Sequence, residues 1–192
     1  MLRTLLRLVN LYNLLRIKIL PLADIDKNLP EKGKIVDLGC GDGFISKYLS
    51  QVKTRAVIGI DINKERLSQS PSNNLKFIEA DIRQYSFKDI DGIIISDVLH
   101  HLNFATQEQI LEKVARNLKK NGVLIIKEID TTEFLRSRLS RLWDLVFYPK
   151  DKIYYWRGDN LRKTLETFGF KVKIIRASRL FPGSTTLFIC RK

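Results

Sequence analysis

Short, largely apolar runs recur along the chain and alternate with segments of helical periodicity. The runs are five to seven residues long and lie at 34–38, 55–61, 75–79, 91–96 and 123–127. Runs of this length, bounded by glycine or polar residues, are typical of buried strands. Between them, apolar positions at helical spacing predict helices at 44–50 and 106–119. This alternation predicts an α/β fold with a doubly wound, mostly parallel sheet.

The limits of the later elements follow from local signals. Thr106 and Gln109 have the spacing of a capping box, and the basic run Lys119-Lys120-Asn121-Gly122 predicts the end of the same helix. A further helix is predicted at 159–168, and two more strands at 171–177 and 185–190. Residues 179–184 between those strands suit a hairpin.

Residues 2–20 predict an amphipathic helix that ends at Pro21. Twelve large apolar side chains share this stretch with polar residues three to four positions apart, which leaves a wide apolar face. Three roles fit such a helix: packing on the body of the protein, lying on a membrane surface, or forming a dimer contact. We expect the whole chain, 1–192, to form a single domain, in which residues 1–32 are an N-terminal helical segment.

The first apolar run leads into a glycine-rich turn, Asp37-Leu-Gly39-Cys40-Gly41-Asp-Gly43. Glycines permit positive φ and let a ligand approach the backbone, and the helix that follows offers free N–H groups. A dinucleotide site would require a third glycine where Phe44 stands. Asp37 would repel a pyrophosphate and suits a ligand that carries an ammonium and a sulfonium, so we do not expect NAD.

An acid also ends the second strand. Asp61 stands twenty residues after Gly41, where a carboxylate can bind both ribose hydroxyls of an adenosine. The neighbouring Ile62 is placed to lie against the adenine. A helix cap near Asn63 is the alternative role for Asp61, and the two roles are compatible.

The Asp-x-Gly-x-Gly-x-Gly turn resembles the first motif of class I S-adenosylmethionine (SAM) methyltransferases. The resemblance covers roughly residues 33–192. It implies SAM as the cofactor and seven strands in the order 3-2-1-4-5-7-6, with the seventh antiparallel. It also implies that Asp81 and Ile82 contact adenine, although Asp81 could instead cap a helix or a turn. The end of the fourth strand, at Ser96, would face the methionine part.

Candidates for a general base cluster after the fourth and fifth strands. His100 and His101 resemble the His-His of many small-molecule methyltransferases, although both could be structural. Asp97 and Glu128 are further candidates, and the sequence does not rank the four. A base is needed only when the acceptor must lose a proton, and histidine needs the least pKa tuning near neutral pH.

Residues 131–158 interrupt the strand–helix alternation and hold seven of the eighteen aromatic residues. A helix is predicted at 133–147. The resemblance implies that this segment is a substrate-side insertion that forms a wall of the acceptor pocket. The alternative is a packing helix with a charged outer face.

Charge and composition limit the partners. The net charge of +13 falls entirely on the ends, with +4 in residues 1–20 and +9 in residues 131–192. Cys40 and Cys190 are far apart and indicate neither a disulfide scaffold nor a metal cluster, so a reducing cytoplasm is expected. The basic ends could contact an anionic membrane surface or RNA. The apolar 2–20 stretch favours the membrane and a lipid-like acceptor over nucleic acid.

These features predict a SAM-dependent methyltransferase acting on an oxygen or carbon of a small, apolar or lipid-like acceptor. The motif of amino-methylating enzymes is missing after the fourth strand, where Ser96-Asp97-Val98-Leu99 stands. Neither cysteine is placed to act as the nucleophile of cytosine methylation. An RNA methyltransferase and a non-catalytic SAM-binding protein are the alternatives.

Overall fold

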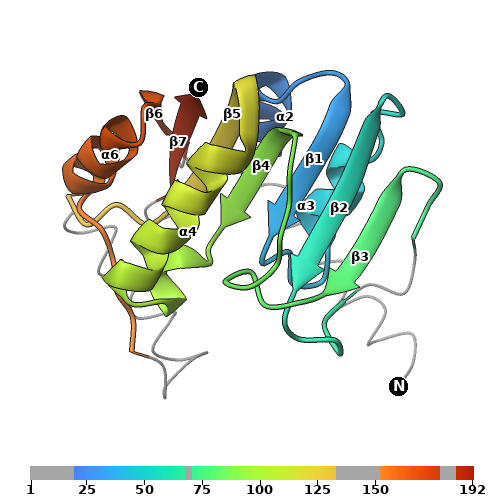
Figure 1. Ribbon diagram of the computed structural model, residues 1–192, viewed down its shortest axis with the longest axis horizontal. Coiled ribbons are helices and arrows are strands. Elements are labelled where there is room, and N and C mark those ends of the chain that lie inside the picture. The colour runs from blue at the N-terminus through green and yellow to red at the C-terminus, as the bar shows by residue number, and fades with distance from the viewer. Residues whose placement is uncertain (1–19, 68–70, 133–151, 178–184) are drawn as a thin grey trace.

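A computed structural model describes residues 20–67, 71–132, 152–177 and 185–192 of the protein. Seven strands form one sheet in the order β3-β2-β1-β4-β5-β7-β6 (Figure 1). Their bounds are β1 Gly33–Leu38, β2 Arg55–Asp61, β3 Leu75–Glu79, β4 Ile90–Ser96, β5 Leu118–Glu128, β6 Lys171–Arg176 and β7 Thr186–Arg191. Strand β7 runs antiparallel to both β5 and β6, and every pairing among β1 to β5 is parallel. The predicted strand order is confirmed.

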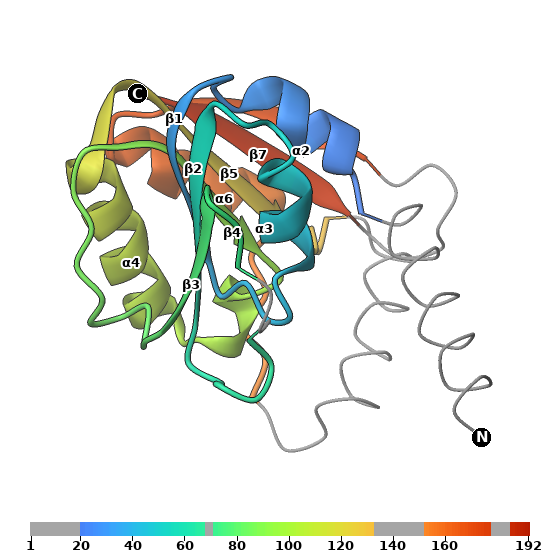
Figure 2. The same ribbon diagram turned by 90° about the vertical axis from the view of Figure 1, so that its right-hand side faces the viewer.

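Helices cover both faces of the sheet. The described helices are α2 Leu22–Asn28, α3 Phe44–Leu49, α4 Phe104–Asn117 and α6 Gly158–Thr167, with a short 3-10 helix, η1 Leu99–His101. Helices α4 and α6 pack on one face and α2 and α3 on the other (Figure 2). The sheet is thus the middle layer of three, as the alternation of strands and helices predicts.

The central strand β4 shows why the sequence pattern is a continuous apolar run there. Ile93 and Ile95 belong to the core under α4 and α6, whereas Ile94 belongs to the core under α2 and α3. All three side chains are inaccessible to solvent. A parallel strand covered on both faces needs apolar residues at successive positions, because both faces are dry.

Two predicted helix limits are wrong. Helix α4 begins at Phe104, and its cap is Asn103, whose side-chain oxygen accepts a hydrogen bond from the Thr106 N–H at 2.9 Å. Thr106 therefore lies inside the first turn, and the Thr106–Gln109 capping box does not form. The helix also ends earlier, at Asn117, because Leu118 is buried and pairs with Ile90 as the first residue of β5.

Three other predictions lie outside the described residues: the helix at 2–20, apart from Leu20, the helix at 133–147 and the connection at 179–184. The antiparallel pairing of β6 with β7 agrees with a hairpin.

A lysine of α4 holds the segment that follows β3. The Lys113 ammonium donates hydrogen bonds to the backbone carbonyls of Ile82, Arg83 and Tyr85, at 2.6, 3.0 and 3.1 Å. It also lies 5.5 Å from the centre of the Phe87 ring. This single side chain therefore fixes the path of residues 82–87 against α4.

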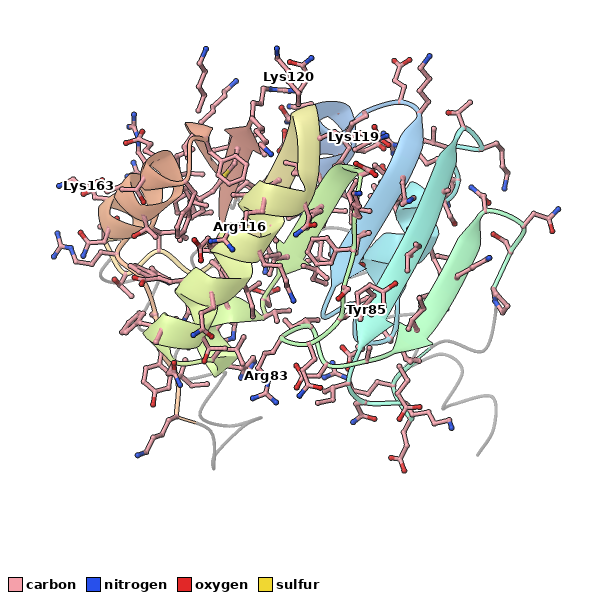
Figure 3. All side chains as sticks on the ribbon, in the orientation of Figure 1. Arg83, Tyr85, Arg116, Lys119, Lys120 and Lys163 are labelled. Carbon is pink, nitrogen blue, oxygen red and sulfur yellow. The ribbon has the colours of Figure 1, made fainter. Side chains whose placement is uncertain are left out.

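We predict that Lys113→Met lowers the free energy of unfolding by about 1–3 kcal/mol, because three carbonyls lose a charged donor. Methionine keeps a side chain of similar length without the charge. Urea denaturation measures the effect. Lys163→Met, on the exposed face of α6 (Figure 3), is the control and should change stability by less than about 0.5 kcal/mol. Equal effects of the two variants would contradict the assigned role.

Candidate active site

A cavity of about 530 Å³ lies at the carboxyl ends of strands β1 to β5. Most of the residues that the sequence marks as site residues line it: Asp37, Gly39, Cys40, Gly41, Asp61, Ile62, Asp81, Ile82, Ser96, His100 and His101. Gly43 and Glu128 are the exceptions, and both lie just behind this wall. The topology gathers these residues because the parallel strands all end at the same edge of the sheet.

The glycine turn is folded back over the end of β2. The N–H groups of Gly39 and Cys40 both donate to the Ile60 carbonyl, at 2.7 and 2.9 Å. Gly39 has φ +78°, and a Cβ there would lie 2.4 Å from a Val98 methyl carbon. Gly43 does not line the cavity; a Cβ there would meet the Phe77 ring at 2.3 Å, so its role is close packing against β3.

Asp61 connects β2 to this turn. Its Oδ2 accepts a hydrogen bond from the Gly41 N–H and its Oδ1 from the Asn63 N–H, both at 2.8 Å. The second bond opens a turn and not a helix, since the described residues that follow Asp61 form no helix, so the helix cap expected as an alternative is not seen there. An ionised carboxylate offers about four acceptor positions. Asp61 can therefore hold the turn and still accept from a ligand.

Ile62 is exposed to the cavity. The accessible fraction of its surface is 63%. Ile62 is one of two large hydrophobic residues that are exposed in the described part of the chain. The side chain lines the cavity beside Asp61. An exposed apolar residue on a cavity wall suits the flat, apolar face of a ligand ring.

Asp37 is turned into the protein. Only 1% of its surface is accessible, and its Oδ2 accepts a hydrogen bond from the Ser46 hydroxyl at 2.6 Å. Burial, with a smaller contribution from the nearby Asp61 and Asp42 charges, raises the pKa of Asp37 to about 6. Asp37 thus lines the cavity as a largely buried carboxyl that is bonded to Ser46.

Burial and the nearby Asp37 and Asp61 carboxylates also raise the pKa of the Cys40 thiol. The thiol therefore stays neutral and is a poor nucleophile.

We predict that Asp37 makes stability depend on pH. The pKa of its carboxyl is higher in the folded state than the ordinary value of 3.8, so the folded state retains the proton longer. Stability should therefore fall as pH rises from 3.8 to about 6. Asp37→Asn removes this loss and keeps an acceptor for Ser46. The variant should exceed the wild type by about 2–3 kcal/mol above that range and by little below it, since one pKa unit is worth about 1.4 kcal/mol.

Urea denaturation across this pH range measures the difference between the two proteins. The exposed Glu31→Gln controls for net charge. A difference between the wild type and Asp37→Asn that stays constant with pH would contradict the prediction.

Arginine residues that the sequence did not mark also line the cavity. Arg83 binds the Asp81 carboxylate with Nε, at 2.9 and 2.8 Å from its two oxygens, and the hydrogen bond from Arg83 lowers the pKa of Asp81. Arg66 lies beside Gly41. Both follow strands in polar segments where arginine is common, so no sequence signal distinguishes them. Any ligand contact at Asp81 must be shared with Arg83.

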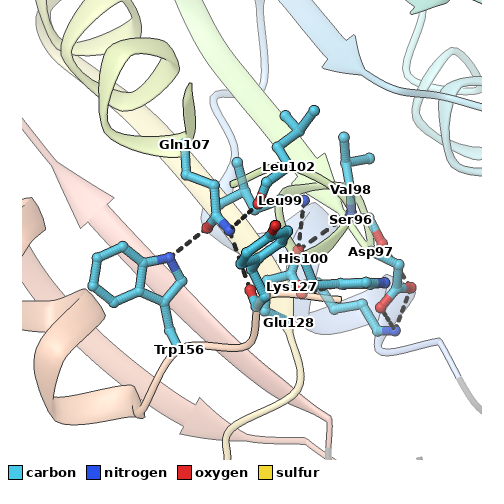
Figure 4. Close-up of polar contacts among 11 residues, drawn as sticks. Ser96, Asp97, Val98, Leu99, His100, Leu102, Gln107, Lys127, Glu128 and Trp156 are labelled. Atoms are coloured by element: carbon cyan, nitrogen blue, oxygen red, sulfur yellow. Dashed lines mark hydrogen bonds and ion pairs between the residues drawn. The ribbon is translucent and has the colours of Figure 1, made fainter. Parts of the chain in front are cut away.

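His100 and Glu128 form a buried pair (Figure 4). His100 Nδ1 lies 2.6 Å from Glu128 Oε2, and the two side chains are 4% and 5% accessible. Glu128 Oε1 accepts from the Val98 and Leu99 N–H groups at 3.2 and 2.9 Å. With these donors on Oε1, the carboxylate is held in one orientation toward the imidazole. An acceptor at Nδ1 favours the proton there and leaves Nε2 able to accept one.

Aromatic rings surround this pair. The His101 ring lies 4.3 Å from the His100 ring, and the Tyr155 ring stacks on His100 at 5.5 Å. The Tyr154 N–H donates to the His100 carbonyl at 2.8 Å. These contacts bring part of the predicted substrate-side segment to the site; residues 133–151 of that segment lie outside the described chain.

Comparison with known proteins shows the family of this chain. The model of a family described as a methyltransferase domain matches residues 10–173. The chain belongs to that family.

Individual relatives share part of the chain. YqeM of Bacillus subtilis, which is named as a methyltransferase, is 38% identical over 112 residues, 53% of this chain and 44% of YqeM. The carboxy-S-adenosyl-L-methionine synthase of Staphylococcus epidermidis is 27% identical over 113 residues, 56% of this chain and 50% of the synthase. The chain thus spans about half the length of these relatives.

A solved structure extends the similarity over most of the fold. The magnesium protoporphyrin IX methyltransferase ChlM from Synechocystis, with bound S-adenosylhomocysteine (SAH), superposes with a TM-score of 0.68. It is 22% identical, and the match covers 89% of this chain and 79% of ChlM. The TM-score shows that the two proteins share a fold, and at 22% identity the similarity shows the fold alone.

Proposed function

We propose that the protein binds SAM and transfers its methyl group to an oxygen or carbon of a small, apolar acceptor. The observation that carries the proposal is the convergence, on one cavity, of the glycine turn, Asp61 and the His100–Glu128 pair. The first two suit an adenosine-containing cation, and the pair suits an acceptor that must lose a proton. Membership of the methyltransferase-domain family supports the same reaction class.

The residues present fit the cofactor. Asp61 keeps acceptor positions for ribose hydroxyls, and Ile62 offers an exposed apolar surface for adenine. Asp81, together with Arg83, is available to the exocyclic amine. When bound, SAM supplies a methyl group activated by its sulfonium. The protein positions the two reactants and excludes water. Such positioning can account for about 7–11 kcal/mol of a reaction barrier.

His100 is the base in this proposal. Glu128 fixes the orientation of the imidazole and stabilises the imidazolium that forms when Nε2 takes a proton from the acceptor. A hydroxyl or an acidic C–H group has such a proton to lose. Correctly placed general bases contribute about 10²–10⁴-fold to rate.

Apolar lining near His100 supports an apolar acceptor. Val98, Leu102 and Ile129 line the cavity, and so does Leu20 at the start of the described chain. Leu20 is the last residue of the stretch predicted as an amphipathic helix, which supports an N-terminal contribution to the acceptor site. A lipid-like acceptor and contact with an anionic membrane remain predictions based on residues 2–20. Among the described residues, no helix has the length and apolar character that crossing a membrane requires.

We predict that the protein binds SAM and SAH but not NAD, and that Asp61→Asn weakens SAM binding about 10–100-fold, as expected for a lost charged hydrogen bond. Asparagine keeps one acceptor for the turn. Isothermal titration calorimetry measures both points. The matched control is Glu79→Gln, because Glu79 is the register partner of Asp61 on β3 and does not line the cavity. NAD binding without SAM binding would exclude the proposal.

We predict that His100→Gln abolishes most turnover while SAM affinity stays within about two-fold, and that Glu128→Gln lowers kcat by a smaller factor. The assay is transfer of label from methyl-labelled SAM to a panel of acceptors, which includes phenols, isoprenoid and acyl compounds, and RNA. Label on RNA alone would favour the nucleic-acid alternative. SAM binding without transfer to any acceptor would favour a non-catalytic SAM-binding protein.

A further inference from the structure

Gln107, in the first turn of α4, is a polar side chain with none of its surface accessible to solvent. A buried amide destabilises a fold unless its donors and its acceptor all have partners. A leucine at this position would avoid that cost. The contacts of Gln107 therefore indicate what the amide contributes there.

The Gln107 amide links α4 to two other segments (Figure 4). Its Nε2 donates to the carbonyls of Leu102, directly after η1, and of Tyr154, at 2.7 and 3.1 Å. Its Oε1 accepts from the indole N–H of Trp156. The indole nitrogen is a donor only, so the amide fits these partners in one orientation. Two of the three partners belong to residues 154–156.

Backbone hydrogen bonds hold the same segment at both ends. The Tyr154 N–H donates to the His100 carbonyl at 2.8 Å. The Trp156 carbonyl accepts from the Thr131 N–H at 3.3 Å and from the Thr131 hydroxyl at 3.0 Å. Residues 154–156 therefore run from η1, after β4, to the residues that follow β5, and Gln107 binds them to α4 as well.

Tyr155 lies between the two residues that Gln107 binds. Its ring stacks on the His100 imidazole, with 5.5 Å between the ring centres and 26° between the planes, a geometry in the range of offset-stacked aromatic pairs. The contact with Glu128 fixes one atom of the imidazole, Nδ1, and leaves the ring able to tilt about that contact. A second ring on the face of the imidazole restricts this tilt. The two contacts together hold His100 in one orientation.

We propose that Gln107 is a positioning residue for methyl transfer, which holds residues 154–156 against η1 and so keeps the Tyr155 ring on the His100 imidazole. The inference rests on the proposed function, in which His100 is the base. His100 lines the cavity, whereas Gln107 does not. Displacement of a reacting group by about 1 Å can cost about 10²-fold in rate, so a residue that touches neither cofactor nor acceptor can control turnover.

The first test is Gln107→Leu, which keeps the approximate size of the side chain and removes its three hydrogen bonds. We expect kcat to fall about 10–100-fold and SAM affinity to stay within about two-fold, because Gln107 bonds to neither the glycine turn nor Asp61. Labelled SAM and the acceptor that the wild type methylates best give kcat, and calorimetry gives the affinity. The same substitution at Gln109, on the exposed face of α4, is the control and should change kcat by less than about two-fold.

Variants of Tyr155 keep the test decisive if Gln107→Leu does not fold. Tyr155→Leu removes the stacked ring and leaves the partners of Gln107 in place, because these are the Tyr154 carbonyl, the Leu102 carbonyl and the Trp156 indole. It should show the same loss of kcat with SAM affinity retained. Tyr155→Phe keeps a ring face and should restore most of the kcat that Tyr155→Leu loses.

Proton NMR of the full chain gives a readout that does not depend on turnover. The chain has two histidines, His100 and His101, so the His100→Gln variant is enough to assign the imidazole resonances. The ring current of Tyr155 displaces the imidazole resonances of His100. This displacement should be lost in Gln107→Leu and Tyr155→Leu and retained in Tyr155→Phe and Gln109→Leu.

The outcomes are distinct. Loss of kcat together with loss of the His100 displacement, at unchanged SAM affinity, supports the inference. Unchanged kcat in folded Gln107→Leu or in Tyr155→Leu overturns it. Equal losses of kcat and SAM affinity also overturn it, because they indicate a purely structural role. The proposed function fails in other proteins of the set: a wild type that does not bind SAM, or His100→Gln with unchanged turnover, overturns it, and this inference with it.

Discussion

The backbone hydrogen bonds that fold the glycine turn over β2 are the constraint on which the site depends. The Ile60 carbonyl receives two N–H groups of the turn, and the Asp61 carboxylate receives a third. These bonds make the ends of β1 and β2 one unit, and they require a backbone without Cβ at Gly39, where Val98 from β4 fills the space. The turn, the ribose-side acid and the β4 loop are thus positioned together.

Four of the acids on the cavity wall are each stabilised in a different way. Asp37 is buried and accepts a hydrogen bond from Ser46, and Asp61 accepts from backbone N–H groups. Asp81 is paired with Arg83, and Asp97 is paired with Lys127. The consequences differ accordingly. The first carboxyl takes up a proton readily, the second organises the backbone, and the third and fourth present ion pairs to the cavity. Identical functional groups therefore have separate roles, set by what lies behind them.

The fold could be predicted because local patterns and the class of fold agree. Continuous apolar runs such as Ile93-Ile94-Ile95 are what a strand buried on both faces requires. The helix limits were harder to predict, because Asn103 and Thr106 are both good capping residues and the local sequence does not select between them. Leu118 shows the same effect, since its burial against β4 ends the helix that local charge and glycine signals would have extended.

The sequence by itself determined which segments are strands, where the glycine turn lies and at which edge the site residues meet, because these follow from periodicity and from short motifs. The order of the strands in the sheet was expected only from the resemblance to class I methyltransferases, and the structure confirms it. Tertiary structure decided which way each side chain faces. Asp37 points inward because Ser46 and the core lie next to it, and Glu128 binds His100 because β5 ends beside the β4 loop. The pairing of Lys127 with Asp97 joins residues thirty positions apart. Such contacts between distant residues leave no local pattern, since they arise only when the sheet is assembled.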